Sequence, residues 1–355
     1  MDGLKPILKL VVEQGATLSR EQARQVLSEV LASESGDGDL EIAALLTAMA
    51  TRGETAEELT GFAEAMRALA TPVPLSDTER AALVDTCGTG GDGLGTFNIS
   101  TGAALVAVAA GAKVAKHGNR AVTSKCGSAD VLEALGVPVT LSPDQAAECL
   151  RATGFMFLLA PSLHPAMKRV MPIRRALGFR TIFNLAGPLT NPAGAQAQVM
   201  GVYSAQKLPI VAESMARLGV RHAFVAHGSD GLDEITVTGG TDLAEVRSVG
   251  ERGQGVGGSV RLFALGLDEM GFSRASLSDL AGGGTAQENA AILLGIFAGE
   301  LGPKRDIVLL NAAAALVVAG VASDFQDGVA RGAAAIDSGA VRTVVQRLAK
   351  FGKET

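Results

Sequence analysis

The chain lacks tryptophan, has a single tyrosine among 355 residues, and carries no excess of positive charge. Proteins that bind nucleic acid along a surface need a basic face and aromatic side chains on which bases stack. Here 37 acidic residues outnumber 31 basic ones, which gives a net charge of −6 and a pI near 5.4. No global field therefore attracts nucleic acid or an anionic membrane, and an anionic ligand has to be captured by local groups.

Cysteine is also scarce, since only Cys87, Cys126 and Cys149 occur and their spacing is not that of a metal site. Their odd number favours reduced thiols in a cytosol. The N-terminus lacks the basic-then-apolar order of a signal peptide. The most hydrophobic run, residues 307–322, is rich in alanine, shorter than a membrane span and interrupted by Asn311, so it predicts a buried helix. We expect a soluble, cytoplasmic protein that has no membrane partner.

The sequence first shows helix signals and then a change of pattern. Residues 19–22 and 55–58 both fit the capping box, each ahead of apolar residues at helical spacing, and residues 42–50 form a further helix-favouring stretch. Two prolines within residues 71–76 predict a stiff linker. Beyond this linker the helical pattern gives way to short strands that alternate with helices.

Short apolar segments predict strands at residues 83–86, 113–115, 198–202 and 222–226, with Ala-rich helices between them. This alternation is typical of the α/β class. In open α/β sheets ligands bind where strands end. The loops that follow these strands are therefore the first places to look for a functional site.

A glycine-rich loop, residues 85–101, follows the first of these strands. Glycines let backbone N–H groups converge on an anion, and Ser100 and Thr101 place hydroxyls at the start of the segment 102–110. If that segment is a helix, its N-terminal dipole points at the ligand. The loop has neither the P-loop nor the dinucleotide-binding spacing, and on its own it is equally compatible with a flexible surface connection.

A second loop, residues 116–130, pairs cations with glycines and hydroxyls directly after the strand-like segment 113–115. In this loop Lys116 could neutralise a phosphate, and Asn119 could donate to a substrate carbonyl or carboxylate. A solvated basic turn is the alternative interpretation. Two such loops that face each other suggest a polyphosphate ligand.

Two further stretches carry charged groups that suit a metal and a carboxylate. Asp233 and Glu234 come after another predicted strand, and Mg²⁺ typically uses one or two carboxylates together with ligand phosphates and water. Arg174, in the stretch 160–192, presents a planar fork of donors that suits bidentate capture of a carboxylate. His164, in the same stretch, is as compatible with a structural hydrogen bond as with a ligand contact.

Together these stretches resemble the anthranilate phosphoribosyltransferase family over almost the whole chain. The resemblance is carried by residues 88–92 with 98–101, by residues 116–120, by residues 187–192 and by the acidic pair 233–234. It implies a small helical N-terminal domain hinged to a larger α/β domain with a central, mostly parallel sheet, and a homodimer. We expect the helical domain to span residues 1–72, the α/β domain to span residues 73–355, and residues 161–192 to pack with the helical domain.

The resemblance also implies a reaction and a set of site residues. The family joins anthranilate to 5-phosphoribosyl diphosphate with the help of Mg²⁺, releases diphosphate and forms N-(5-phosphoribosyl)anthranilate, a step of tryptophan biosynthesis. Lys116 and Arg174 are the expected catalytic residues. The positions that match phosphoribosyl diphosphate contacts are Gly88, Gly91, Asp92, Thr96, Asn98, Ser100, Thr101, Lys116 and Ser128. Those that match anthranilate contacts are Gly88, Asn119 and Arg174, and those that match Mg²⁺ ligands are Ser100, Asp233 and Glu234.

Two other functions are alternatives to anthranilate phosphoribosyl transfer. A pyrimidine nucleoside phosphorylase shares the two-domain plan, but it normally carries an additional C-terminal domain and a different basic loop, whereas this chain keeps Asn119 and Arg120. A catalytically silent relative that binds nucleic acid would need the basic face and stacking aromatics that the composition lacks.

Overall fold

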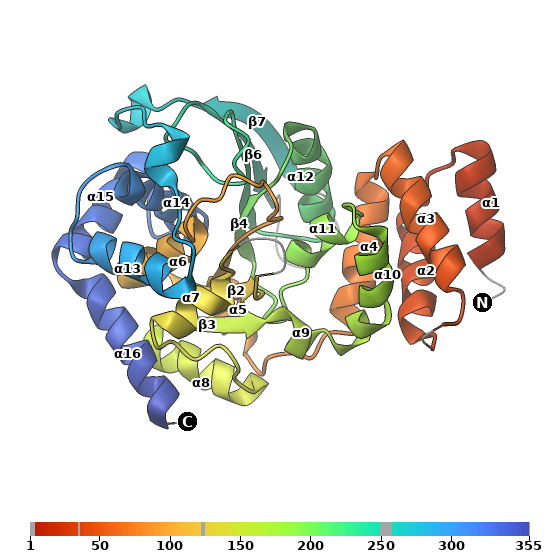
Figure 1. Cartoon of the computed structure of the whole chain (residues 1–355), viewed down its shortest axis with the longest axis horizontal. Coiled ribbons are helices and arrows are strands. Elements are labelled where there is room, and N and C mark those ends of the chain that lie inside the picture. Colours follow the sequence, from red (N-terminus) through yellow and green to blue (C-terminus); the bar gives the residue numbers. More distant parts are fainter. Residues whose placement is uncertain (1–3, 35, 122–124, 249–257, 355) are drawn as a thin grey trace.

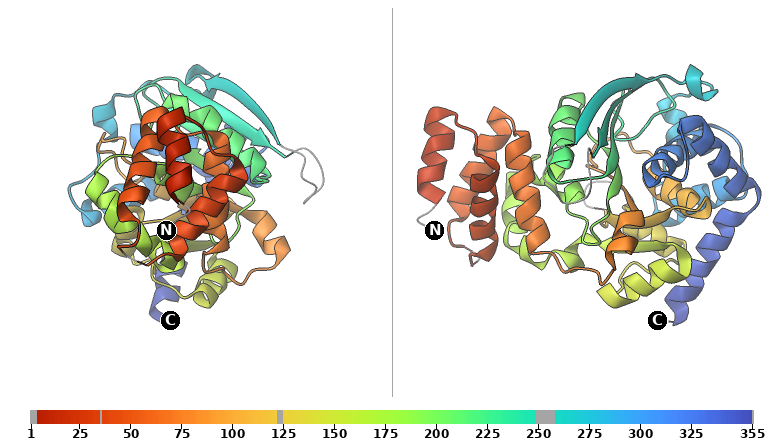
Figure 2. Two further views of the ribbon diagram at one scale, coloured as in Figure 1. Left: turned by 90° about the vertical axis from the view of Figure 1, so that its right-hand side faces the viewer. Right: turned by 180° about the vertical axis from the view of Figure 1, so that it is seen from behind.

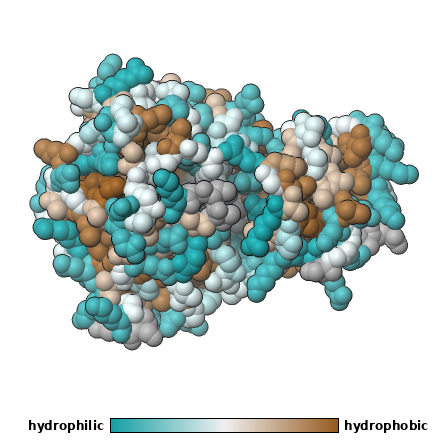
Figure 3. Space-filling view, in the orientation of Figure 1, coloured by the Kyte–Doolittle hydropathy of each residue, from teal (hydrophilic) through white to brown (hydrophobic). Residues whose placement is uncertain are grey.

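The computed structural model describes residues 4–34, 36–121, 125–248 and 258–354. A small helical part lies beside a larger part that is built around a sheet (Figure 1). The space-filling view shows the molecule narrowing between the two (Figure 3). Four helices open the chain: α1 (Leu4–Gln14), α2 (Arg20–Ala32), α3 (Asp39–Arg52) and α4 (Ala56–Ala68).

Both predicted capping boxes are confirmed, at the starts of α2 and α4. The side chain of Thr55 accepts from the N–H of Glu58, and the carboxylate of Glu58 accepts from the N–H of Thr55 at 3.0 Å. The same fully buried carboxylate accepts from the N–H of Leu18 at 2.9 Å and pairs with the guanidinium of Arg52 at 2.6 Å. Glu58 therefore ties α4 to the segment that precedes α2.

The larger part is organised by a seven-stranded sheet of order β3-β2-β1-β4-β5-β6-β7. The first five strands pair in parallel, while β6 and β7 add to β5 as antiparallel strands. The predicted, mostly parallel sheet is confirmed. The strands are β1 (Leu83–Gly88), β2 (Lys113–Gly118), β3 (Phe155–Leu159), β4 (Ala197–Gly201), β5 (His222–Gly228), β6 (Thr241–Arg247) and β7 (Ser259–Leu265).

Each of the four expected strands begins at or next to the expected residue, but β3, β6 and β7 were not anticipated. The other helices are α5 (Asp77–Ala82), α6 (Ile99–Ala109), α7 (Ser128–Ala134), α8 (Pro143–Thr153), α9 (Ala160–Leu163), α10 (Met171–Leu177), α11 (Phe183–Ala186), α12 (Leu208–Arg217), α13 (Ala286–Phe297), α14 (Pro303–Ala319), α15 (Phe325–Asp337) and α16 (Ala340–Glu354).

The two faces of the sheet are covered by different elements. Val84 and Val199 pack into a core with α6 and α14, whereas Met200 and Val225 pack into a second core with α12 and the N-terminal helices. This second core also takes in side chains of α10 and α11, such as Ile173. Seen from behind, α4 lies between the first helices and the sheet part (Figure 2). The helical part thus includes a segment from the middle of the chain, and the domain boundaries expected from the sequence stay predictions.

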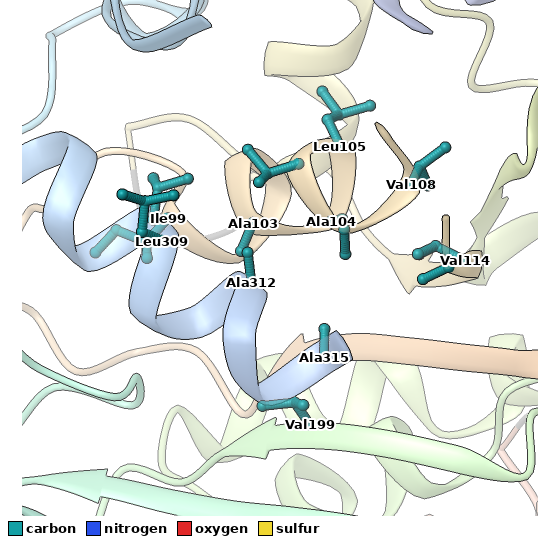
Figure 4. Close-up of a cluster of buried hydrophobic side chains, with 14 of the residues drawn as sticks. Ile99, Ala103, Ala104, Leu105, Val108, Val114, Val199, Leu309, Ala312 and Ala315 are labelled. Atoms are coloured by element: carbon teal, nitrogen blue, oxygen red, sulfur yellow. The ribbon is translucent and has the colours of Figure 1, made fainter. Parts of the chain in front are cut away.

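The apolar run that was expected to form a buried helix is α14, so that prediction is confirmed. Small side chains let α14 approach α6 closely, with Ala312 and Ala315 beside Ala103 and Ala104 (Figure 4). A Cβ added to Gly102 of α6 would lie 2.8 Å from the side chain of Leu293, so a larger residue would force that side chain to move. Among the described residues, no helix combines the length and the apolar character needed to cross a membrane.

We predict that Glu58→Ala destabilises the protein by about 3 kcal/mol, because it leaves buried N–H groups without an acceptor and the Arg52 guanidinium without its partner. Urea unfolding followed by circular dichroism measures this loss. Glu29→Ala, which removes an exposed carboxylate from α2, serves as the control and should cost less than about 0.5 kcal/mol. Equal stability of the two variants would contradict the role given to Glu58.

Candidate active site

The predicted loops meet at one edge of the sheet. Strands β1, β2, β4 and β5 run parallel, so their carboxyl ends lie on the same side. The glycine-rich loop leaves β1, the Lys116 loop continues from β2, and the acidic pair follows β5. Within the Lys116 loop, residues 122–124 lie outside the described residues.

The acidic pair binds the backbone of the glycine-rich loop. The N–H of Gly90 donates to Asp233 at 2.7 Å, and the N–H of Ser100 donates to Glu234 at 3.1 Å. Two strand-end glycines make this approach possible. A Cβ added to Gly88 would lie 2.6 Å from the Asp233 carboxylate, and one added to Gly201 would lie 1.5 Å from the Asp233 carbonyl oxygen. Only glycine fits at position 201, and a side chain at position 88 would displace the Asp233 carboxylate.

Lys116 lies at the centre of this arrangement and is 2% exposed. Its Nζ donates to the carbonyl oxygen of Thr86 and to Oγ of Ser100, the latter at 3.2 Å. Burial lowers the pKa of Lys116, and the charges of Asp85 and Glu234 oppose that change. The side chain is thus held between β1 and the first turn of α6.

The electrostatics of the acidic pair fit a divalent cation. Burial raises the pKa of both carboxyls, and the charge of Asp92 raises that of Asp233 further, as the charge of Asp233 does for Glu234. Crowded, desolvated carboxylates of this kind are relieved by a metal ion. Across the described residues no cluster of three or more His, Cys, Asp or Glu side chains has metal-site geometry. Two carboxylates are enough for Mg²⁺ when ligand phosphates and water complete its coordination.

One cavity, of about 560 Å³, brings together the three residues expected to contact anthranilate, Gly88, Asn119 and Arg174. His117 and His164 also line this cavity, and the centroids of their rings lie 5.1 Å apart. Burial lowers the pKa of His117 to about 3 and that of His164 to about 4, so both imidazoles are neutral near pH 7. The remaining wall is largely apolar, with Met66, Met167, Met171 and Phe183 among its side chains. A flat apolar molecule with a polar edge fits such a cavity.

A second cavity, of about 750 Å³, adjoins the first and is lined by Gly91, Asp92 and Thr96 of the glycine-rich loop. The two cavities share Arg174 and Arg175 of α10. Lys125, Arg175 and Arg180 add positive charge to the second cavity. An anion in one cavity and an apolar molecule in the other would therefore meet along α10.

Other predicted residues lie beside the cavities rather than on their walls. The helix α6 begins at Ile99, earlier than expected, so Ser100 and Thr101 are in its first turn. Thr101 is 1% exposed and points into the protein. Asn98 precedes the helix and donates to the carbonyl of Cys126 at 3.2 Å, and Ser128 donates to the carbonyl of Asn119 at 3.2 Å.

Comparison with known proteins covers both parts of the chain. The model described as "Glycosyl transferase family, a/b domain" matches residues 80–342, and the one described as "Glycosyl transferase family, helical bundle domain" matches residues 5–70. An anthranilate phosphoribosyltransferase from Solibacter usitatus is 51% identical over 351 residues, which is 99% of this chain and 99% of that protein. One from Pelotomaculum thermopropionicum is 50% identical over 348 residues, which is 98% of this chain and 96% of that protein.

The chain belongs to the anthranilate phosphoribosyltransferase family. This confirms the fold and the enzyme class that the sequence predicted, a phosphoribosyltransferase of tryptophan biosynthesis, and it disfavours both alternatives. The crystal structure of the anthranilate phosphoribosyltransferase from Thermus thermophilus superimposes with a TM-score of 0.87 at 41% identity, covering 99% of this chain and 100% of that one.

Two structures of the Saccharomyces cerevisiae anthranilate phosphoribosyltransferase carry ligands. One is in complex with PRPP and Mg, with a TM-score of 0.86 and 27% identity over 100% of this chain and 99% of that chain. The other is in complex with 4-fluoroanthranilate, with a TM-score of 0.85 and 25% identity over 100% of this chain and 99% of that chain.

Arg180, which restrains the glycine-rich loop, was not anticipated from the sequence. Its guanidinium donates to the carbonyl oxygen of Gly91 and stacks on the Tyr203 ring, with 4.2 Å from its central carbon to the ring centroid. The backbone N–H of Tyr203 also donates to Oγ1 of Thr89 in the same loop, at 3.0 Å. Since the partners of Arg180 are distant in sequence, no local motif could have revealed it.

We predict that Arg180→Met loosens this loop in the free protein. Losing a charged hydrogen bond and a cation–π contact should cost about 1–2 kcal/mol, so amide hydrogen exchange in residues 89–98 should become roughly tenfold faster. Hydrogen exchange read by mass spectrometry checks this. Arg261→Met is the matched control, because Arg261 also stacks on an aromatic ring, at 4.5 Å from the Phe263 centroid, but on β7. Unchanged exchange in the Arg180 variant would show that it does not restrain the loop.

Proposed function

We propose that this chain transfers the 5-phosphoribosyl group of 5-phosphoribosyl diphosphate to the amine of anthranilate, releasing diphosphate and forming N-(5-phosphoribosyl)anthranilate. One observation carries the proposal: the acidic pair and Lys116 meet at the glycine-rich loop, beside a cavity that holds Arg174. An anion site and an acceptor site are thereby adjacent. A pyrimidine acceptor has no carboxylate for Arg174 to bind.

We propose that Mg²⁺ is held by the carboxylates of Asp233 and Glu234 and by the hydroxyl of Ser100. When bound, the ion neutralises negative charge on the diphosphate. The raised pKa of the two carboxyls, caused first by their burial, is the local observation that favours a cation there. The yeast relative that is in complex with PRPP and Mg supports Mg²⁺ as the cation, though not the choice of ligands.

The phosphoribosyl diphosphate contacts are proposed for the glycine-rich loop and its surroundings. The exposed loop glycines, Gly90 and Gly91, adopt positive φ angles of 66° and 75°, which only glycine reaches without strain. The buried amino group of Lys116 lies against Thr86 and Ser100, near the two ends of this loop. The full set is Gly88, Gly91, Asp92, Thr96, Asn98, Ser100, Thr101, Lys116 and Ser128, and Thr101 would act through its place in the first turn of α6, because its side chain is buried.

Anthranilate is proposed to bind in the first cavity against Gly88, Asn119 and Arg174. Burial lowers the pKa of Arg174, and its guanidinium lies 5.3 Å from the Phe183 ring centroid and contacts the sulfur of Met171 at 3.6 Å. Within the described part of the chain, no carboxylate acts on the pKa of Arg174, so a substrate carboxylate would supply the missing counter-charge. The methionine and phenylalanine side chains would cover the ring of the acceptor.

The geometry explains catalysis chiefly by electrostatics. As diphosphate leaves ribose C1, negative charge grows on the leaving group and positive charge grows on the sugar. Lys116 and the loop N–H groups stabilise the departing anion more than they stabilise the bound substrate. The aromatic amine is neutral near pH 7 and attacks C1 without a strong base, so we assign no general base. Arg174 and Asn119 orient the amine toward C1.

We also propose a homodimer in the cytoplasm. Val12 of α1 is 59% exposed and Leu40 of α3 is 84% exposed, which leaves apolar surface on the helical part for a second copy. Cys87, Cys126 and Cys149 form no disulfide in the described part of the chain, as a reducing compartment would keep them.

The activity itself is tested by mixing the protein with Mg²⁺, phosphoribosyl diphosphate and an acceptor. With anthranilate, we expect diphosphate release and loss of anthranilate fluorescence. With uracil or thymine, we expect neither an adduct nor diphosphate. Turnover of a pyrimidine in place of anthranilate would refute the proposed acceptor.

We predict that Arg174→Ala raises the KM for anthranilate by roughly a hundredfold and leaves that for phosphoribosyl diphosphate within about twofold, because a charge-assisted pair contributes about 2–3 kcal/mol. Steady-state kinetics with each substrate varied in turn measures this. Arg331→Ala, which changes an exposed arginine on α15, should alter neither value. An equal rise in the KM for both substrates would show that Arg174 is assigned to the wrong ligand.

A further inference from the structure

One buried amide stands out in the apolar helix α14. From Ile307 to Ala319, Asn311 is the only polar residue of this helix, and it is 3% exposed. A buried polar group in such a place is tolerated only when its hydrogen bonds are satisfied. The partners of Asn311 therefore indicate what it is for.

Asn311 binds both backbone groups of a single residue. Its Nδ2 donates to the carbonyl oxygen of Ile235 at 2.8 Å, and its Oδ1 accepts from the N–H of Ile235 at 3.0 Å. A third bond, from Nδ2 to the carbonyl of Ile307 at 2.9 Å, fixes the orientation of the amide. The Asn311 amide thus makes the same pair of hydrogen bonds with the Ile235 backbone that a neighbouring β-strand would make.

Ile235 comes directly after the acidic pair. The segment is also held from its other side, because Asp230 accepts from the N–H of Leu232 at 3.0 Å and from the hydroxyl of Thr236 at 2.6 Å. Between these two anchors lie Asp233 and Glu234, whose charges repel each other. The backbone on each side of the pair is therefore held in place.

The same helix also supports the opposite side of the site. Side chains along α14 pack on α6 (Figure 4). The first turn of α6 donates the Ser100 N–H to Glu234. Asn311 thereby connects the acidic pair to the element that carries Ser100. A leucine would fill the same volume but would leave the N–H and carbonyl of Ile235 unpaired, and Ile235 is fully buried.

We propose that Asn311 is a positioning residue for the metal site: by pairing with the backbone of Ile235 it fixes the distance between the Asp233 and Glu234 carboxylates and their place beside Ser100. This inference rests on the metal role proposed for the acidic pair. Asn311 itself touches neither metal nor substrate. Its effect is on cation affinity, which a residue that merely fills the core would not change.

The test uses Mn²⁺ alone, titrated into the full-length protein and followed by the electron paramagnetic resonance signal of the free ion. Asn311→Leu should weaken Mn²⁺ binding by about tenfold to a hundredfold, the usual consequence of losing a group that orients a metal ligand. Asn311→Asp keeps the acceptor for the Ile235 N–H and should weaken binding less. This second variant decides the question if the leucine variant does not fold.

Two further variants distinguish failure of the proposed metal site from failure of the positioning role of Asn311. Thr153→Val also removes a buried hydroxyl that accepts from a backbone N–H, that of Phe155 at 3.2 Å, and should bind Mn²⁺ as the unchanged protein does. Asp233→Asn with Glu234→Gln should abolish binding, and if it does not, the proposed metal site is wrong. If the acidic pair proves essential while both Asn311 variants bind Mn²⁺ normally, the positioning role is wrong and the metal site stands.

Discussion

Two hydrogen bonds join the loops that make up the candidate active site: the backbone N–H of Gly90 donates to the Asp233 carboxylate, and that of Ser100 donates to the Glu234 carboxylate. They bring the segment after β5 onto the loop between β1 and α6. Without them, two buried carboxylates would lose the donors that hold them in this position. The arrangement is costly, since burial raises the pKa of both carboxyls and a nearby charge raises each further, that of Asp92 for Asp233 and that of Asp233 for Glu234. The surrounding packing supports this arrangement.

That packing depends on glycines as much as on large apolar residues. Gly88 and Gly201 allow Asp233 to lie against the strand ends, and Gly102 allows α6 to approach its neighbours. The sheet then supplies a rigid edge, while α10 contributes walls to both cavities. The proposed acceptor cavity, with its neutral histidines, and the proposed anion site, with its buried charge, are thus kept adjacent but chemically distinct. Such preorganisation favours transfer from one to the other.

The sequence was informative where the signal is local. Capping boxes, the parallel strands and the glycine-rich loop each leave a short pattern, and the structure has them. Three charged residues, Asp242, Glu245 and Arg247, interrupt the apolar pattern of β6, so this antiparallel strand was missed. Strand β7 was missed although it carries a single charge, at Arg261. Strand β3 is a short apolar run that periodicity alone does not distinguish from helix. Arg180 and Asn311 act on residues far along the chain, at Gly91 and Ile235, so no window of sequence contains both partners.

The central claim is that one cation site lies where the acidic pair meets the first turn of α6. Its most direct test is a crystal grown with phosphoribosyl diphosphate and Mn²⁺, in which anomalous scattering locates the metal. The account predicts a peak within coordination distance of both Asp233 and Glu234, with the diphosphate between it and the glycine-rich loop. A diphosphate bound in this cleft whose metal lies away from both carboxylates would contradict it.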